Sequence, residues 1–301
     1  MAEHAHHHHH EHEHHPHHGH GGAGMGLRAA ALLTIAFAVV EGVGGWWTGS
    51  LALLSDAGHM LTDGAALGLG ALAAWMARRP PSQRHSYGLG RAEIVAALVN
   101  AAAMLVIVVA LAYESIVRLK APTAVNGGAA ALIAAVGLAL NLWVIRRLHG
   151  HDMNTRAARL HVVGDALGSI AALGAGAVIY FTGWTLVDPL ASLAICVLIA
   201  VSSVRLLRES MHALMEGVPH GLSVETIGAE MARIDGVLSV HDLHVWTLSG
   251  SRIALSAHVV VRSMAHWERT LAELQVRLQE KFKIDHITLQ PESTTRPLVR
   301  H

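Results

Sequence analysis

Six apolar segments, each long enough to cross a lipid bilayer, dominate the first two-thirds of this 301-residue chain. A membrane-spanning helix needs about 20 predominantly apolar residues, and 52% of the chain is hydrophobic whereas only 15% is charged. That charged fraction is well below the soluble average of about 25%. The sequence therefore predicts an α-helical membrane bundle with spans near residues 27–47, 51–76, 93–117, 125–147, 160–181 and 186–207.

Basic residues are distributed unequally between the two sides of the predicted bundle. The connection at 77–92, the connection between the fourth and fifth spans and the end of the sixth span all carry arginines, whereas the other side carries only Arg118 and Lys120. Because cytoplasmic connections are enriched in Lys and Arg, we expect both termini in the cytoplasm. Lys plus Arg and Asp plus Glu each number 22, so no bulk charge indicates a nucleic-acid partner.

In two of these spans a histidine is followed four residues later by an aspartate. The pairs are His59 with Asp63 and His161 with Asp165. On an α-helix this spacing puts both side chains on one face, about one turn apart, so two such helices facing each other would gather two imidazoles and two carboxylates. Divalent transition metals, zinc above all, accept four such ligands. One pair alone could equally be a structural hydrogen bond between helices, but two copies favour an ion path.

After about residue 208 the pattern changes to that of a soluble α+β domain. The order helix, strand, strand, helix, strand predicts a ferredoxin-like αββαβ domain of about 85 residues, whose small size favours dimerisation. The expected elements are 224–234, 237–248, 253–261, 267–282 and 284–290. The predicted organisation is a disordered tract over 1–24, a membrane domain over 25–208 and a cytoplasmic domain over 209–301.

The first 20 residues contain twelve histidines, interleaved with glutamates. A purification tag is the simplest alternative, but the interleaved Glu, Pro16 and Gly19 favour a native tract. We expect it to be disordered and to capture metal weakly near the entrance of the membrane domain.

These motifs together resemble the cation diffusion facilitator family of divalent-metal/proton antiporters, and its bacterial zinc, cadmium and cobalt resistance branch most of all. The stretches that carry the resemblance are SLALLSDAGHMLTD (50–63), YGLGRAE (87–93), HVVGDALGS (161–169), DP (188–189) and VHDLHVW (240–246). The resemblance implies a homodimer in a bacterial inner membrane. It also implies a transport site formed by His59, Asp63, His161 and Asp165, which is the site that the spacing indicates.

The resemblance also suggests a second metal site in the tail domain. His241, His258 and His266 align with cytoplasmic ligands of the family, whereas Leu289 and Pro291 stand where some relatives have His and Asp. Glu292, or else His286 or His244, could substitute, and surface histidines that bind metal weakly or not at all are the alternative. The resemblance also implies a charge link between Arg91 and Glu216. It implies no tight metal site at His85, because Leu89 stands where such relatives have a second histidine.

The mechanism expected from these residues is exchange of metal for protons. The chain contains no GxxxxGK[ST] phosphate loop, so we expect no ATP coupling. Metal and proton compete for the same imidazole, and histidine titrates near neutral pH. We therefore expect Zn²⁺, with Cd²⁺ and Co²⁺ as further substrates, to leave the cytoplasm as protons enter. An intramembrane metalloprotease would need HExxH, which no span contains; a metal sensor or buffer without transport is the other alternative.

Overall fold

The computed structural model describes residues 21–147, 153–250 and 252–293. For residues 21–31, 147 and 153–161 it describes the helical backbone alone. Residues 1–20 of the tract predicted over 1–24 lie outside the described residues, so their expected disorder and metal capture stay predictions, whereas residues 21–24 belong to a helix.

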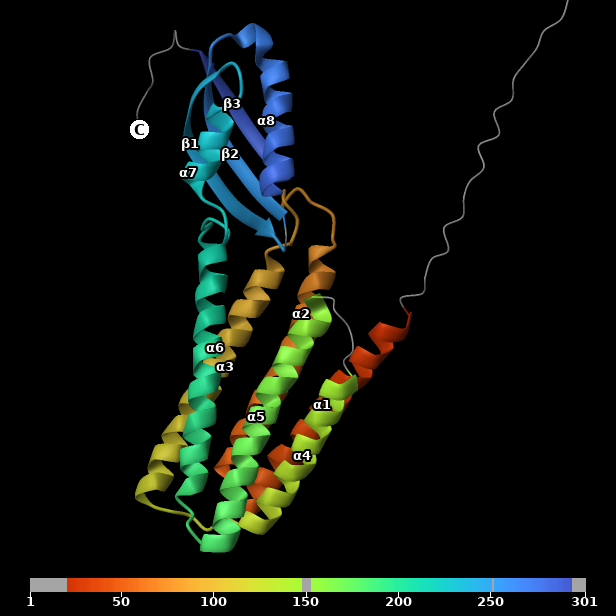
Figure 1. Cartoon of the computed structure of the whole chain (residues 1–301), viewed down its shortest axis with the longest axis vertical. Coiled ribbons are helices and arrows are strands. Elements are labelled where there is room, and N and C mark those ends of the chain that lie inside the picture. Colours follow the sequence, from red (N-terminus) through yellow and green to blue (C-terminus); the bar gives the residue numbers. More distant parts are fainter. Residues whose placement is uncertain (1–20, 148–152, 251, 294–301) are drawn as a thin grey trace, which may run out of the picture.

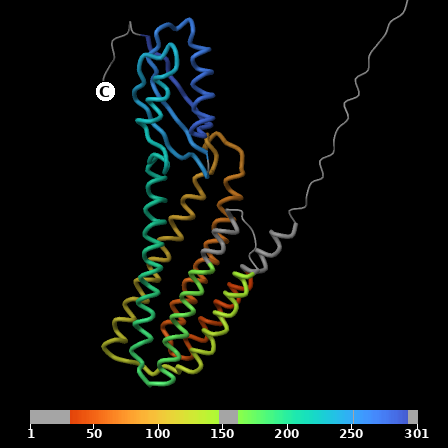
Figure 2. Tube along the Cα trace, in the orientation of Figure 1, coloured from red at the N-terminus to blue at the C-terminus, as the bar shows by residue number. Residues whose placement is uncertain are grey.

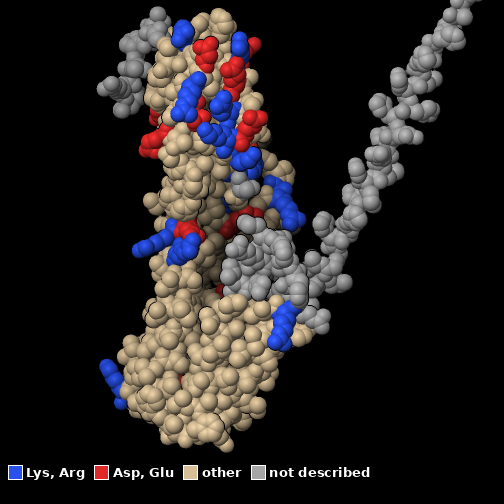
Figure 3. Space-filling view, viewed as in Figure 1, with Lys and Arg blue, Asp and Glu red and all other residues tan. Residues whose placement is uncertain are grey.

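Six long helices form a bundle, and they match the six apolar segments of the sequence (Figure 1). They are α1 (Gly21–Thr48), α2 (Leu51–Ala77), α3 (Ala92–Lys120), α4 (Gly127–Arg147), α5 (Met153–Thr182) and α6 (Val187–Leu214). Five of the helices are long and apolar enough to cross a membrane, and the described side chains of α1 add a shorter apolar stretch, Leu32–Thr48. Charged side chains gather on the tail domain and leave most of the visible bundle surface uncharged (Figure 3). The chain is therefore a multi-pass membrane protein.

Helix α2 occupies the centre of the bundle, where it packs against α1, α3, α5 and α6. Helices α3 and α6 pack along each other on one side, and α4 and α5 on the other. This arrangement brings the two histidine-aspartate helices, α2 and α5, into direct contact, as the metal-site hypothesis requires.

The tail domain has the predicted αββαβ order. It contains α7 (Val224–Ala232), β1 (Val237–Ser249), β2 (Arg252–Val261), the short 3₁₀ helix η1 (Met264–His266), α8 (Trp267–Phe282) and β3 (His286–Ser293). The sheet order is β1-β2-β3, with β1 antiparallel and β3 parallel to β2. Strand β3 continues to Ser293, three residues beyond its expected end, because its parallel pairing with β2 runs on to Val261.

One face of this sheet carries the apolar core beneath the helices, and the other face is open. Along β2, Leu255, Ala257 and Val259 join the core that Ile227 and Leu274 of the helices complete. Successive strand residues point to opposite faces. His258 therefore emerges on the face away from the core.

The tail domain contacts the bundle through the connection between α2 and α3. Helix α6 leads from the bundle into the tail domain, and the tip of the β1–β2 hairpin lies against this connection (Figure 2). The ring of Tyr87 meets that of His286 edge-on, with centroids 5.5 Å apart. The expected link between Arg91 and Glu216 is present, at 2.9 Å.

Candidate metal-transport site

The start of α2 is held by a carboxylate from α6. Ser50 caps the helix and donates its hydroxyl to Oδ1 of Asp188 at 2.6 Å. The backbone N–H groups of Leu51 and Ala52 donate to the same carboxylate at 2.6 and 3.3 Å. The first N–H groups of a helix lack partners within the helix and carry partial positive charge, so a buried carboxylate is a strong cap for them.

Three of the four predicted transport ligands meet between α2 and α5. The ligand atoms of His59, Asp63 and Asp165 all lie within 4.8 Å of one another. Nδ1 of His59 lies 3.5 Å from an oxygen of Asp63, and its Nε2 lies 3.9 Å from an oxygen of Asp165. Asp165 is fully buried, whereas the side chains of His59 and Asp63 are each 20% exposed. One imidazole thus stands between two carboxylates.

The fourth predicted ligand, His161, lies one helical turn before Asp165 on α5. Its side chain lies outside the described residues, so its part in the site stays a prediction that rests on the helical spacing.

A further carboxylate adjoins these ligands and is tied to the surrounding helices. Asp56 lies three residues before His59, is buried, and accepts a hydrogen bond at 3.1 Å from the hydroxyl of Ser169 on α5. Ser169 in turn accepts a hydrogen bond from Asn141 of α4 at 3.3 Å. Asp56 is therefore held against α5, and through Ser169 it is linked to α4.

One imidazole and two carboxylates converging at this spacing can bind a divalent transition metal. Zinc sites combine three or four such ligands in a tetrahedron, with Zn–N and Zn–O distances of about 2.0–2.2 Å. With one ligand atom taken from each residue, the three atoms lie within 4.8 Å of one another, near enough for one ion to draw them together. Imidazole also favours zinc, cadmium and cobalt over magnesium and manganese, which prefer more oxygen ligands.

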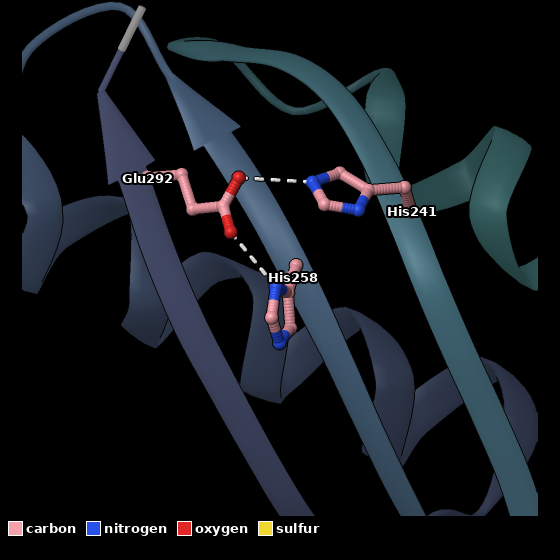
Figure 4. A group of neighbouring side chains, drawn as sticks. All are labelled: His241, His258 and Glu292. Carbon is pink, nitrogen blue, oxygen red and sulfur yellow. Dashed lines mark hydrogen bonds and ion pairs between the residues drawn. The ribbon is translucent and has the colours of Figure 1, made fainter. Parts of the chain in front are cut away.

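A second cluster lies on the open face of the tail sheet. His241 and His258 are paired across β1 and β2, with ring centroids 5.3 Å apart. Glu292 of β3 bridges them, because its two oxygens accept hydrogen bonds from His241 at 2.9 Å and from His258 at 2.8 Å (Figure 4). The hydrogen bond from His241, followed by that from His258, lowers the pKa of Glu292 below its usual range. Glu292 is therefore a carboxylate at neutral pH and offers an oxygen ligand beside two imidazoles.

The other predicted tail ligands lie apart from this cluster. His266 borders a surface hollow with Asp235 and Arg262 and is not among the ligand atoms that converge on Glu292. His244 bonds to Asp242 at 2.9 Å, and this hydrogen bond lowers the pKa of Asp242. His286 contacts the ring of Tyr87 instead.

Sequence reasoning missed the role of Asp188. Asp188-Pro189 entered only as one of the stretches that carry the family resemblance, and nothing local in the sequence indicates that this carboxylate caps α2, where Leu51 lies 137 residues away. Proline near a helix start is a common signal, but the partner of the preceding aspartate depends on packing. A second missed feature is a buried trio of hydroxyls, from Ser55, Ser115 and Ser192, that joins α2, α3 and α6.

Comparison with known proteins places both parts of the chain. Residues 27–215 match the cation efflux transmembrane domain, and residues 219–294 match the cytoplasmic domain of cation efflux proteins. Proteins of this family are transporters and not enzymes.

Individual relatives are similar over most of their length. The zinc transporter ZitB of Escherichia coli (strain K12) is 42% identical over 267 residues, which cover 86% of this chain and 84% of ZitB. The cadmium, cobalt and zinc/H(+)-K(+) antiporter of Bacillus velezensis is 36% identical over 272 residues, 87% of this chain and 86% of the relative. The metal cation efflux system protein CzcD of Cupriavidus metallidurans is 36% identical over 269 residues, 88% of this chain and 85% of CzcD. The chain therefore belongs to the cation efflux, or cation diffusion facilitator, family of membrane transporters.

Proposed function

We propose that this protein exports zinc, and also cadmium and cobalt, from the cytoplasm in exchange for protons, through a site formed by His59, Asp63, His161 and Asp165. The observation that carries the proposal is the convergence of His59, Asp63 and Asp165 within 4.8 Å between two apolar helices. Ionisable groups at such a position are costly and mark ion paths. The names of the relatives, a zinc transporter and a cadmium, cobalt and zinc/H(+)-K(+) antiporter, support the same substrates.

The proposed coupling follows from ligand chemistry. A nitrogen or oxygen ligand must be deprotonated to bind metal, so metal uptake displaces protons and protonation expels the metal. His59 stands between Asp63 and Asp165, and protonation of its ring removes a ligand and adds positive charge at the point where the ion sits. Because imidazole titrates near neutral pH, the exchange is reversible under cellular conditions.

Zinc flux into proteoliposomes under an imposed pH gradient tests this proposal. The variants are Asp63→Asn and Asp165→Asn, which keep the side-chain shape and remove the charge. Loss of a residue that only hydrogen-bonds to a metal ligand already lowers metal affinity or activity by about 10–100-fold. Loss of a ligand itself should therefore lower zinc flux by about 100-fold or more.

The matched control is Glu114→Gln, a carboxylate of α3 that pairs with Arg118 away from the site. It should keep wild-type flux. Zinc flux that is indifferent to the pH gradient, or that survives in both aspartate variants, would refute the proposal, and tight binding without flux would favour the sensor or buffer alternative.

We further propose that His241, His258 and Glu292 bind a metal ion that regulates transport, and that the protein is a homodimer with both termini in the cytoplasm of a bacterial inner membrane. Two imidazoles and one carboxylate on the open sheet face suit zinc and leave a fourth position for water or another ligand. His266 is left out of this set because it lies in a different hollow of the tail domain.

Zinc titration of the full chain tests the tail site. His258→Ala should remove one bound zinc per chain and leave the Asp63-dependent site filled, whereas His266→Ala should leave the stoichiometry unchanged. Equal stoichiometry in wild type and His258→Ala would mean that Glu292 only bridges the two histidines. Light scattering of the purified protein reports whether it is a dimer.

A further inference from the structure

A second buried carboxylate lies on α1, outside the proposed ligand set. Glu41 is fully buried within the bundle, and neither of its oxygens has a hydrogen-bond partner among the described residues. Its side chain fits because α4 presents a glycine to it: a Cβ atom on Gly137 would lie 2.5 Å from Oε1 of Glu41. Burial of an ionised carboxylate without hydrogen-bond donors is strongly unfavourable.

Asp56 is likewise packed against a glycine, between α2 and α5. A Cβ atom on Gly168 would lie 2.2 Å from its Oδ1, and this oxygen has no hydrogen-bond partner in the described part of the chain. Its other oxygen accepts the hydrogen bond from Ser169. Both carboxylates thus sit against glycine backbone.

The groups that face Glu41 add negative charge rather than compensate for it. Helix α1 packs against α2 and α4. Asp56 of α2 and Asp165 of α5 lie close enough to Glu41 to interact with it electrostatically, and both are carboxylates. Helix α4 has no titratable residue before Arg146, and the described residues include no Lys or Arg that forms an ion pair with Glu41 or Asp56. The cation that such a carboxyl can hold in this space is a proton.

We propose that Glu41 is a proton-binding residue of the transport cycle, separate from the metal ligands, that is protonated when the metal site is empty and ionised when zinc is bound. The inference rests on the proposed metal/proton exchange. A divalent ion near Asp165 adds two positive charges that repel the proton and favour the carboxylate of Glu41. The step is balanced: zinc binds, the O–H bond of Glu41 breaks, one proton leaves, and the bonding electrons stay on the carboxylate.

The number of protons released per zinc bound tests this role. Calorimetric titration of the purified protein in buffers of different ionisation enthalpy gives that number, and the slope of log Kd against pH gives it independently, because each displaced proton changes Kd about ten-fold per pH unit. Glu41→Gln mimics the protonated side chain and should release about one proton fewer per zinc, with unchanged zinc stoichiometry. Glu41→Asp keeps a carboxyl and should restore the release, and Glu114→Gln should behave as wild type.

The outcomes separate this inference from the proposed function. Wild-type protein that binds zinc without releasing protons would refute the exchange itself, whereas coupled wild type with an unchanged Glu41→Gln would refute the role of Glu41 alone. If Glu41→Gln does not fold, zinc-induced infrared difference spectra of wild type and Glu41→Asp test the role of Glu41 instead. In wild type, the carbonyl band of a protonated carboxylic acid should disappear when zinc binds. In Glu41→Asp, that band should lie at a shifted frequency. A wild-type spectrum without that band would overturn the inference.

Discussion

Replacement of Gly168 by alanine tests whether the close approach of α5 to α2 holds the proposed metal ligands together. A Cβ atom on Gly168 would lie 2.2 Å from Oδ1 and 2.9 Å from Cγ of Asp56, whereas ordinary contacts of a carbon atom are about 3.5–4.0 Å. Asp56 has a short side chain, is buried, and is held by Ser169. To relieve the contact, either Asp56 swings aside or α5 retreats by about 1 Å, and either movement weakens that hydrogen bond.

The expected destabilisation follows from two opposing effects. Overpacking of a tight site costs about 1–3 kcal/mol, and replacing a helical glycine by alanine gains about 1 kcal/mol. Gly174 on the same helix has no atom within 4 Å of a built Cβ, so Gly174→Ala carries the gain alone. The two variants should therefore differ by the packing cost, about 1–3 kcal/mol, which corresponds to about 2–12 °C in Tm.

Thermal unfolding in detergent and zinc titration measure the two consequences. Because Asp165 lies one turn from Gly168 on α5, a retreat of the helix lengthens the distance from Asp165 to His59, so Gly168→Ala should bind zinc more weakly than Gly174→Ala. If Gly168→Ala unfolds at the same temperature as Gly174→Ala and binds zinc as wild type does, the contact is not tight and the reasoning fails.

Two further predictions concern carboxylates outside the ligand set. Asp188→Asn keeps one acceptor oxygen but turns an amide group towards the N–H and O–H donors at the start of α2. It should therefore lower the free energy of unfolding by about 2–4 kcal/mol, and it should lower zinc flux because His59 is displaced. An unchanged Tm would show that the cap contributes little. Glu230→Gln should lower the Tm of the tail domain at pH 7, because the hydrogen bond from Lys281, with Arg233 and Arg277, lowers the pKa of Glu230. A pKa that is lower in the folded state gives stability that is present above the unfolded value of about 4.3 and is lost as pH falls through the folded value. The difference in Tm between wild type and Glu230→Gln should therefore shrink below pH 4. A difference that does not change with pH would contradict this.

The elements of this protein were predictable because their signals are local. The six apolar segments are read from hydrophobicity over about 20 residues, and the αββαβ order of the tail from short periodic runs. The pairing of His59 with Asp63 needs only the helical spacing. That α2 meets α5 depends on packing, and the sequence supported it only through the repeated motif and the family resemblance.

Long-range contacts set the parts that the sequence did not predict. The expected third strand ended at 290, so the place of Glu292 beside His258 depended on a pairing with β2 that only the folded sheet specifies. The cap of α2 by Asp188 and the glycine that accommodates Asp56 are contacts between helices far apart in the chain. A glycine or an aspartate in an apolar span can have several roles, and its role depends on the residues that it contacts in the folded protein.

The buried carboxylates also explain why a metal site of this kind should need protons to empty. Glu41 and Asp56 are enclosed by apolar helices without an ion pair to Lys or Arg among the described residues, and they adjoin a site that itself contains two aspartates. A divalent cation at His59 relieves this excess of negative charge, which favours loading. If the metal left alone, the excess would return in a medium of low dielectric constant, where it is most costly. In the proposed exchange, unloading is therefore favourable only when protons replace the metal, and the charge that attracts zinc would also couple its release to the proton gradient.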